Sequence, residues 1–495
     1  MLYIDTFCAI LYNFIVNLCD IIIISKNFVK NKEYFEMKIS IRDFGAKPDG
    51  KIQTTAIQAA IDHCFLGGGG EVVIPEGIYF TGGIRLRSNI TLHLMENAVL
   101  KGVRDPEEYY GYLHDNVEPL AGNQITDAGY IGLWNIHGET EYDENDERYR
   151  FKRIPGSRWN NALIRAIDAE NIAIIGESGS LIDGDNCYDA IGEEDYRGPH
   201  AIGFFRVKGI KLSGYTVKNS GNWAHHLLFC DNVVASKIKV EAGHDGFDAA
   251  VCRNILIEDC EFYTGDDCIA GFGNTNVFVN NCVLNSSCSA FRFGGTNVYI
   301  KGCKAYAPGK YSFRGSLSNE EKIAGTMATS ENARNNMLSF FTYYADYSVP
   351  ISEEPGNIVI EDCEICGADR FLHYNFSGNE TWQRYRPLRD ITFKNIKVID
   401  VSMPLTLYGT ETNKVELIMK NMSVRMRKGA SVSEFIRACN YERISIDEMS
   451  IEGFDGECIV KSKGNGNIEI KNINGLSNIK AYVLQTEEDF IIEKI

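Results

Sequence analysis

One pattern recurs in Asn254-Ile-Leu-Ile-Glu-Asp-Cys260, Asn276-Val-Phe-Val-Asn-Asn-Cys282 and Asn297-Val-Tyr-Ile-Lys-Gly-Cys303. A further copy begins at Asn232, and the four starts are spaced by 22, 22 and 21 residues. Weaker copies begin at Asn171, Asn357 and Asn467. Apolar residues at every second position, bounded by Gly, Asn and Asp, are typical of short β-strands. The regular spacing therefore indicates one strand repeated along a stack.

A single strand of this kind cannot bury its inner face, but stacked copies enclose one continuous core. The sequence predicts an all-β fold, a single-stranded right-handed parallel β-helix (solenoid). The alternative is a β-sandwich, whose strands would recur roughly every 8–12 residues with hairpin turns. From Thr54 to Phe65 the apolar residues share one helical face, which predicts an N-terminal capping helix over the open end of the solenoid.

We expect one catalytic β-helix domain over residues 37–495, with loop insertions near 103–160 and 305–350 where the repeat is lost. Residues 1–36 are interpreted as a non-structural extension, with Met37 as a candidate start. Residues 9–24 are largely apolar, but polar residues interrupt them and no basic residue precedes them. Neither a signal peptide nor a clean spanning helix has that form. The predicted location is the cytoplasm, with a membrane anchor as the alternative.

The composition limits the partners. The chain has 495 residues, a net charge of −17 and 15 cysteines. An acidic balance argues against nucleic acid or an anionic membrane surface, so no stable membrane insertion is expected. Cys230 and Cys252, and again Cys260 and Cys282, lie 22 residues apart, which predicts a ladder of buried thiols and not a disulfide framework. Free thiols fit a reducing compartment, and no metal or other cofactor is expected.

Stacking also predicts a site. Positions one period apart should lie above one another, about 4.8 Å apart. Adding 22 residues builds three columns: Trp223, Asp245, Asp267 and Ser289; Asn222, His244, Asp266 and Cys288; His226, Asp248, Ala270, Arg292 and Arg314. Asp245 and Asp267 are then direct neighbours, with Asp266 beside them. Carboxylates this close repel, so one keeps a proton or a cation bridges them.

Glycoside hydrolysis needs such an arrangement, because an acid must protonate the leaving oxygen while a base activates water. The structural alternatives are an Asp/Asn ladder that satisfies turn amides and a calcium-binding corner. A single aspartate would fit those alternatives, but three together favour catalysis. Asp248 is assigned a structural role.

Three segments carry a resemblance to a known family: Asp43-Phe-Gly-Ala-Lys-Pro-Asp-Gly50, Asn219-Ser-Gly-Asn-Trp-Ala-His-His226 and Thr264-Gly-Asp-Asp-Cys-Ile-Ala270. The chain resembles the polygalacturonases and related enzymes of family 28 glycoside hydrolases. The family's Asn-Thr-Asp motif matches Gly243-His244-Asp245 in its aspartate alone, and its Asp-Asp motif matches Asp266-Asp267 in full. The resemblance implies an inverting glycosidase acting on pectin or a related plant glycan. It also implies that Asp266 is the general acid, and that Asp245 and Asp267 hold the attacking water.

Two motifs of that family are altered in this chain. Its Gly-His-Gly aligns with Cys288-Ser289-Ala290, so the histidine is absent. Its Arg-Ile-Lys, which binds the galacturonate carboxylate, has no intact copy, and Phe313-Arg314-Gly315 is the nearest match. The candidates for substrate binding are therefore Trp223, His226, His244, Arg292, Arg314 and Ser289. Arg292 could instead be an outward-facing salt-bridge partner.

Three functions follow from these patterns. The leading hypothesis is a glycosidase with a carbohydrate partner, acting on a pectin-type or related polysaccharide or oligosaccharide. A polysaccharide lyase or epimerase would use the aspartates to bind calcium. A non-catalytic glycan-binding β-helix would keep the fold without the reaction, and the missing histidine motivates that alternative.

Overall fold

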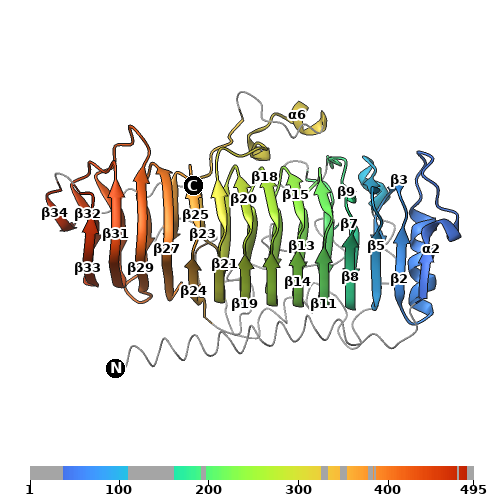
Figure 1. The fold of residues 1–495 in the computed structure, drawn as a ribbon, viewed down its shortest axis with the longest axis horizontal. Helices are drawn as coiled ribbons and strands as arrows, with labels where there is room; N and C mark the ends of the chain where they lie inside the picture. Colours follow the sequence, from blue (N-terminus) through green and yellow to red (C-terminus); the bar gives the residue numbers. More distant parts are fainter. Residues whose placement is uncertain are drawn as a thin grey trace.

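The computed structural model describes residues 37–109, 161–190, 197–324, 333–345, 354–376, 383, 386–476 and 479–487. These residues form an elongated stack of coils in which each strand pairs in parallel with the strand one coil away (Figure 1). One continuous hydrophobic cluster runs inside the stack from Ile41 to Val460. The predicted all-β solenoid is confirmed.

The coils present three faces, called here A, B and C. Face A holds β1 (Met37–Ser40), β2 (Gly70–Ile74), β5 (Ile90–Leu94), β8 (Glu170–Gly176), β11 (Lys208–Ser213), β14 (Asp231–Ser236), β17 (Arg253–Glu258) and β24 (Gly356–Glu361). Face B holds β3 (Gly77–Thr81), β6 (Ala98–Gly102), β9 (Leu181–Asp183), β12 (Thr216–Lys218), β15 (Lys239–Ala242), β18 (Glu261–Thr264), β20 (Val283–Ser286), β22 (Lys304–Tyr306) and β25 (Glu364–Cys366).

Face C holds β4 (Ile84–Arg85), β7 (Ala162–Ile167), β10 (His200–Phe205), β13 (His225–Leu228), β16 (Phe247–Ala250), β23 (Ser339–Tyr343), β26 (Arg370–Asn375), β28 (Leu405–Tyr408), β30 (Glu434–Cys439), β32 (Cys458–Lys463) and β34 (Ala481–Gln485). Longer strands continue from one face to the next. β19 (Ile269–Asn280) and β21 (Ser289–Lys301) join C to A, and the strands that join A to B are β27 (Asp390–Val401), β29 (Val415–Met426), β31 (Tyr441–Glu452) and β33 (Asn467–Asn474).

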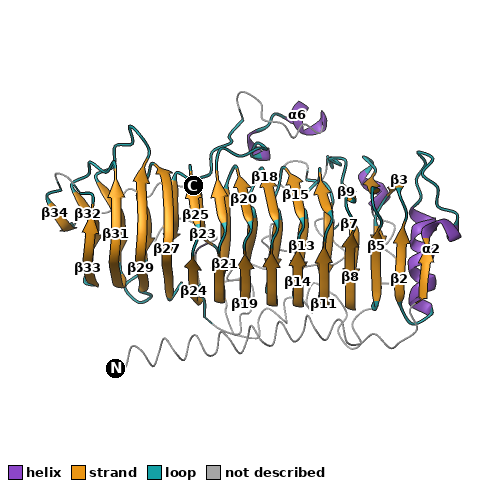
Figure 2. Ribbon diagram, in the orientation of Figure 1, coloured by secondary structure: helices purple, strands orange, loops and turns teal. Residues whose placement is uncertain are grey.

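Helix α2 (Thr54–Leu66) covers the N-terminal end of the strand stack, as predicted (Figure 2). Its Ile57, Ala60, Ile61 and Cys64 are buried against the first coils. The other described helices are short: η1 (Ile41–Phe44), η2 (Pro106–Tyr109), η6 (Arg314–Ser316) and α6 (Asn319–Ala324). Among the described residues, no helix is long and apolar enough to cross a membrane.

The repeating Asn marks the corner between faces C and A. Asn232, Asn254, Asn276 and Asn297 all have φ between 56° and 59°, the left-handed region that Asn tolerates better than most residues. Each side-chain amide donates to the Asn one coil below, over 3.1 Å from Asn254 to Asn232 and 3.2 Å from Asn297 to Asn276. Asn therefore recurs because it satisfies the corner conformation and links successive coils.

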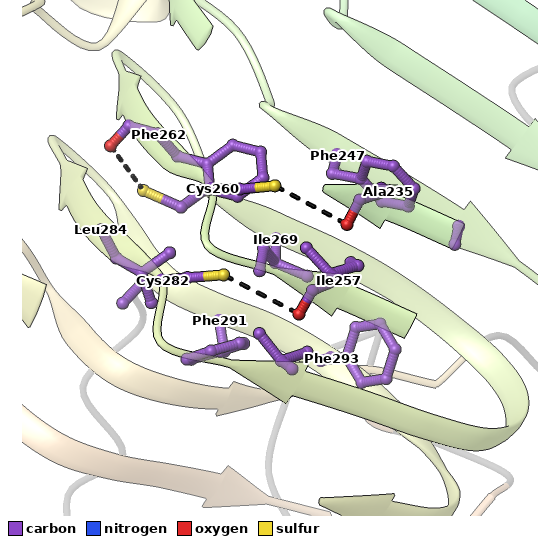
Figure 3. Packing of buried hydrophobic residues seen from close by; sticks show 14 of the residues in the cluster. Ala235, Phe247, Ile257, Cys260, Phe262, Ile269, Cys282, Leu284, Phe291 and Phe293 are labelled. Carbon is purple, nitrogen blue, oxygen red and sulfur yellow. Dashed lines mark hydrogen bonds between the residues drawn. The ribbon is translucent and has the colours of Figure 1, made fainter. Parts of the chain in front are cut away.

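The cysteines form the predicted ladder. Cys260, Cys282, Cys303 and Cys363 occupy matching positions in successive coils, and all four are buried free thiols. The Cys260 and Cys282 thiols lie 3.8 and 3.9 Å from the carbonyl oxygens of Ala235 and Ile257 (Figure 3). These thiols fill the narrow interior and donate weakly to backbone carbonyls.

The predicted N-terminal extension, residues 1–36, and residues 110–160 of the first insertion lie outside the described residues. The described part of the second insertion carries η6 and α6, which project from the stack near β18 and β20 in Figure 1. This insertion makes one predicted position wrong. Arg292 is followed in its column by Thr342 of β23, and not by Arg314. The 22-residue count fails there because the inserted loop adds residues without adding a coil.

Candidate active site

The three predicted aspartates lie where face B turns into face C. Asp245 precedes β16, and Asp266 and Asp267 precede β19. Phe247 pairs with Ile269, which places Asp245 and Asp267 one coil apart at the same position. All three carboxyl groups are buried, with Asp267 fully enclosed and Asp266 7% exposed. The structure thus brings together the residues that stacking predicted.

Backbone contacts hold the aspartates in line. The Asp267 N–H donates to Asp245 Oδ1 over 3.2 Å, and the Ser289 N–H donates to Asp267 Oδ1 over 2.9 Å. The Asp266 carbonyl accepts hydrogen bonds from Thr264 Oγ1 at 2.7 Å and from Ser286 Oγ at 2.6 Å. Each turn is therefore fixed by its neighbours, so the carboxyl groups cannot spread apart to relieve their repulsion.

Burial and mutual repulsion favour protonated carboxyl groups here. The pKa of Asp267 is raised to about 6 by burial and by the charge of Asp266, while Arg292 and hydrogen bonds from Ser289 and Cys288 oppose the rise. Burial and the neighbouring aspartates raise the pKa of Asp245 well above its usual value. The cluster titrates as a unit and holds a proton at neutral pH.

Two arginines flank the aspartates. Arg292 Nη1 lies 3.7 Å from Asp267 Oδ2, and its guanidinium stacks on the Tyr344 ring at 4.5 Å. Arg292 is thus turned toward the carboxylates, although it is also the salt-bridge partner named as the alternative. Arg197 Nη2 lies 3.8 Å from Asp266 Oδ2. The stacking rule missed Arg197, because it lies in the connection between β9 and β10 and not in a repeating strand.

His226 and Trp223 lie beside the aspartates in a cluster of rings. The His226 ring is 5.1 Å from the Trp223 ring and 4.7 Å from the ring of His200, which the sequence did not single out. His226 Nδ1 lies 3.3 Å from Asp248 Oδ1, one coil away in the same column. This contact fits the structural role assigned to Asp248.

Ser289 lies directly above Asp267, at the position where the family motif would supply histidine. Its side chain is buried, and its hydroxyl lies 3.5 Å from the hydroxyl of Thr342. His244 lies one coil below Asp266 and is also buried. Arg314 is absent from the predicted column, but η6 brings it near His244, because its charge acts on that ring.

The second insertion is docked on the catalytic turn through backbone atoms. The Ser287 hydroxyl donates to the Tyr311 carbonyl, and the Lys310 N–H donates to Asn285 Oδ1 over 2.7 Å. A Cβ atom at Gly265 would lie 2.1 Å from the Ser312 carbonyl oxygen. Only glycine permits this approach, so residue 265 determines how closely the insertion meets the aspartates.

We therefore expect Gly265→Ala to destabilise the fold by roughly 1–3 kcal/mol through overpacking, and to lower activity as the insertion shifts. The added methyl would also lie 2.5 Å from the Gly243 carbonyl oxygen, and backbone atoms cannot rotate away. The thermal unfolding midpoint and the hydrolysis rate measure the two effects. An unchanged midpoint with full activity would contradict this docking.

A metal ion is one alternative explanation of the acidic cluster. Among the described residues, Asp266, Asp267 and Cys288 offer one ligand atom each within 4.8 Å of one another. Calcium takes about six to eight oxygen ligands, and this group offers a thiol in place of one. Burial and the charges of Asp267 and Asp266 raise the pKa of the Cys288 thiol well above its usual value, which disfavours the thiolate. The residues therefore fit a calcium site poorly.

Comparisons with known proteins point to one family. Residues 136–289 match the model of glycosyl hydrolases family 28. The chain is 29% identical over 160 residues to a polygalacturonase of Saccharomyces cerevisiae, covering 30% of this chain and 43% of that protein. It is 28% identical over 244 residues to a probable polygalacturonase of Vitis vinifera, covering 47% and 43%. The chain thus spans less than half the length of these curated relatives.

Among solved structures, the family 28 exopolygalacturonase of Yersinia enterocolitica is similar with a TM-score of 0.52. The alignment has 16% sequence identity and covers 92% of this chain and 79% of that one. At this identity the likeness concerns the fold. The matched segment 136–289 includes all three aspartates and Ser289.

Proposed function

Because the chain belongs to glycosyl hydrolases family 28 through residues 136–289, we propose that it hydrolyses O-glycosidic bonds of a pectin-type or related plant polysaccharide or oligosaccharide. The observation that carries the proposal is the buried line of Asp245, Asp266 and Asp267, aligned by the contacts from Asp267 N–H and Ser289 N–H. Compressed carboxylates are unfavourable for folding but useful for acid–base hydrolysis.

In the proposed reaction Asp266 donates its proton to the glycosidic oxygen as the bond from that oxygen to the anomeric carbon breaks. A water molecule attacks the anomeric carbon from the opposite face and transfers a proton to the carboxylates of Asp245 and Asp267. Asp266 and Asp267 offer oxygens within 4.8 Å of each other, closer than the roughly 6.5–9.5 Å between acid and base in inverting enzymes. We therefore assign the water to Asp245 and Asp267 jointly, and inversion is the expected outcome.

The experiment is hydrolysis of a panel of pectic oligosaccharides, with the anomer of the first product read by NMR. An α-linked substrate should release a β product, and an α product would overturn the inverting mechanism. Activity abolished by a chelator, with an unsaturated product absorbing in the ultraviolet, would favour the lyase or epimerase. Sugar binding that survives loss of all three aspartates, without turnover, would favour the non-catalytic alternative.

The pH dependence gives an independent prediction. Asp267 holds water as a base only when it is deprotonated, and its pKa is raised to about 6. We therefore expect kcat/KM to fall as the pH drops below about 6. The charge of Arg292 opposes this rise, so Arg292→Gln should move the acid limb to higher pH, while Arg292→Lys should move it less. An acid limb that stays in place in Arg292→Gln would contradict the role of Asp267.

A further inference from the structure

Two buried polar side chains near Asp266 have no hydrogen-bond partner. Arg314 is 3% exposed, and within the described chain neither of its terminal nitrogens, Nη1 and Nη2, is hydrogen-bonded. His244 is also 3% exposed, and the same holds for both nitrogens of its ring. A buried donor without an acceptor is unfavourable, and most so when it is charged. Such side chains are suited to a group that the chain itself does not supply.

The two side chains reach the same place from different parts of the fold. His244 lies one coil below Asp266 in the same column. Arg314 begins η6, and Ser312, two residues earlier, presses its carbonyl against Gly265, the neighbour of Asp266. Burial, followed by the charges of Arg197 and Arg314, lowers the pKa of His244 well below its usual value. His244 is therefore neutral and offers one N–H donor.

The surroundings carry positive charge although the chain as a whole carries −17. Arg334, from the returning arm of the insertion, stacks on Phe313 at 4.1 Å, and its Nη1 is buried without a hydrogen-bond partner among the described residues. The charge of Arg334 acts on Cys288, which adjoins Asp266 in the column. Arg197 pairs with Asp266 itself at 3.8 Å. The guanidinium groups therefore outnumber the acid that they face.

We propose that Arg314 and His244 form an anion pocket that binds the carboxylate of the sugar unit on the leaving-group side of the scissile bond. An arginine binds a carboxylate through two parallel N–H donors, and both terminal nitrogens of Arg314 are available for this. The pocket makes the chain selective for acidic oligosaccharides, through a residue of the inserted loop and not of a repeating strand. This inference rests on the proposed function, because Asp266 defines the leaving-group side.

Binding can be measured without turnover in the Asp266→Asn protein, by calorimetric titration with trigalacturonate and with its neutral trimethyl ester. We expect the acidic trisaccharide to bind roughly 10- to 100-fold more tightly than the ester. Adding Arg314→Gln should remove that preference and leave binding of the ester unchanged. Arg314→Lys should keep part of the preference, because lysine retains the charge without the paired donors.

The matched control is Arg253→Gln, since Arg253 is exposed and pairs with Asp231 over 3.4 Å away from the site. It should leave both affinities unchanged. Equal binding of acid and ester by the parent protein would overturn the inference, as would equal weakening of both ligands by Arg314→Gln. If that variant does not fold, the preference of the parent protein and the Arg314→Lys result decide the matter.

Failure of the inference is distinguishable from failure of the proposed function. Hydrolysis that depends on Asp266 but ignores the sugar carboxylate would remove only the anion pocket. Selective binding of the acid by a chain that never hydrolyses it would remove the proposed reaction and leave the pocket in place.

Discussion

Asp266→Asn is expected to lower kcat/KM by a factor of about 10²–10⁴, the usual contribution of a general acid. Asparagine has nearly the same shape as aspartate but cannot deliver a proton to the leaving oxygen. The contacts that position residue 266 use its backbone carbonyl, which accepts from Thr264 Oγ1 and Ser286 Oγ, so the turn should stay intact. The measurement is steady-state hydrolysis of the best pectic oligosaccharide, with substrate binding measured in parallel.

The matched control for this change is Asp259→Asn. Asp259 is exposed and has φ of 53°, a conformation that asparagine adopts readily, so both activity and stability should stay as they are. Unchanged hydrolysis in Asp266→Asn would show that the acid has been assigned to the wrong residue. A substrate with a better leaving group should recover part of the lost rate, because it needs less proton donation.

Asp267→Asn is expected to abolish activity and, at neutral pH, to raise the free energy of unfolding. A carboxyl group whose pKa is higher in the folded chain favours folding below its unfolded pKa, and this stability is lost as the pH rises through the folded pKa. For Asp267 the pKa rises from 3.8 to about 6, which corresponds to about 3 kcal/mol lost by pH 7. Asparagine avoids this loss and still accepts the Ser289 N–H.

Thermal unfolding at two pH values tests this expectation. At pH 7.5 the midpoint for Asp267→Asn should exceed that of the parent protein, and near pH 3.5 the two should agree. Loss of the Arg292 contact will offset part of the gain, since that guanidinium lies 3.7 Å from Asp267 Oδ2. A midpoint difference that is the same at both pH values would mean that ionisation of Asp267 is not its cause. Asp259→Asn again serves as the control.

The neighbours along the stack were predictable from sequence because strand pairing converts a fixed period into spatial proximity. Asp245 and Asp267 could be placed together, and so could Asn254 and Asn276, since no insertion lies between these positions. The same rule placed Arg314 above Arg292 wrongly, because it counted residues of the inserted loop as part of a coil. A period is informative only where each coil has the same length.

Groups brought by loops were outside the reach of the period. Arg197 and Arg334 carry no repeat signal, and their nearness to the aspartates depends on how two connections fold back onto the stack. Gly265 gave no signal either, although the Ser312 carbonyl lies so close that a side chain would not fit. A sequence method would have needed to predict loop docking, which depends on long-range packing and not on local pattern.

The sequence by itself determined the solenoid, the corner asparagines, the interior thiols and the line of three aspartates, since each follows from alternation and period in adjacent coils. The tertiary structure alone decided which charges surround those aspartates. It turned Arg292 toward Asp267, set Arg197 against Asp266 and buried Arg314 near His244. The physical reason is that a repeat encodes contacts between neighbouring coils, whereas an inserted loop is positioned by the surface on which it packs.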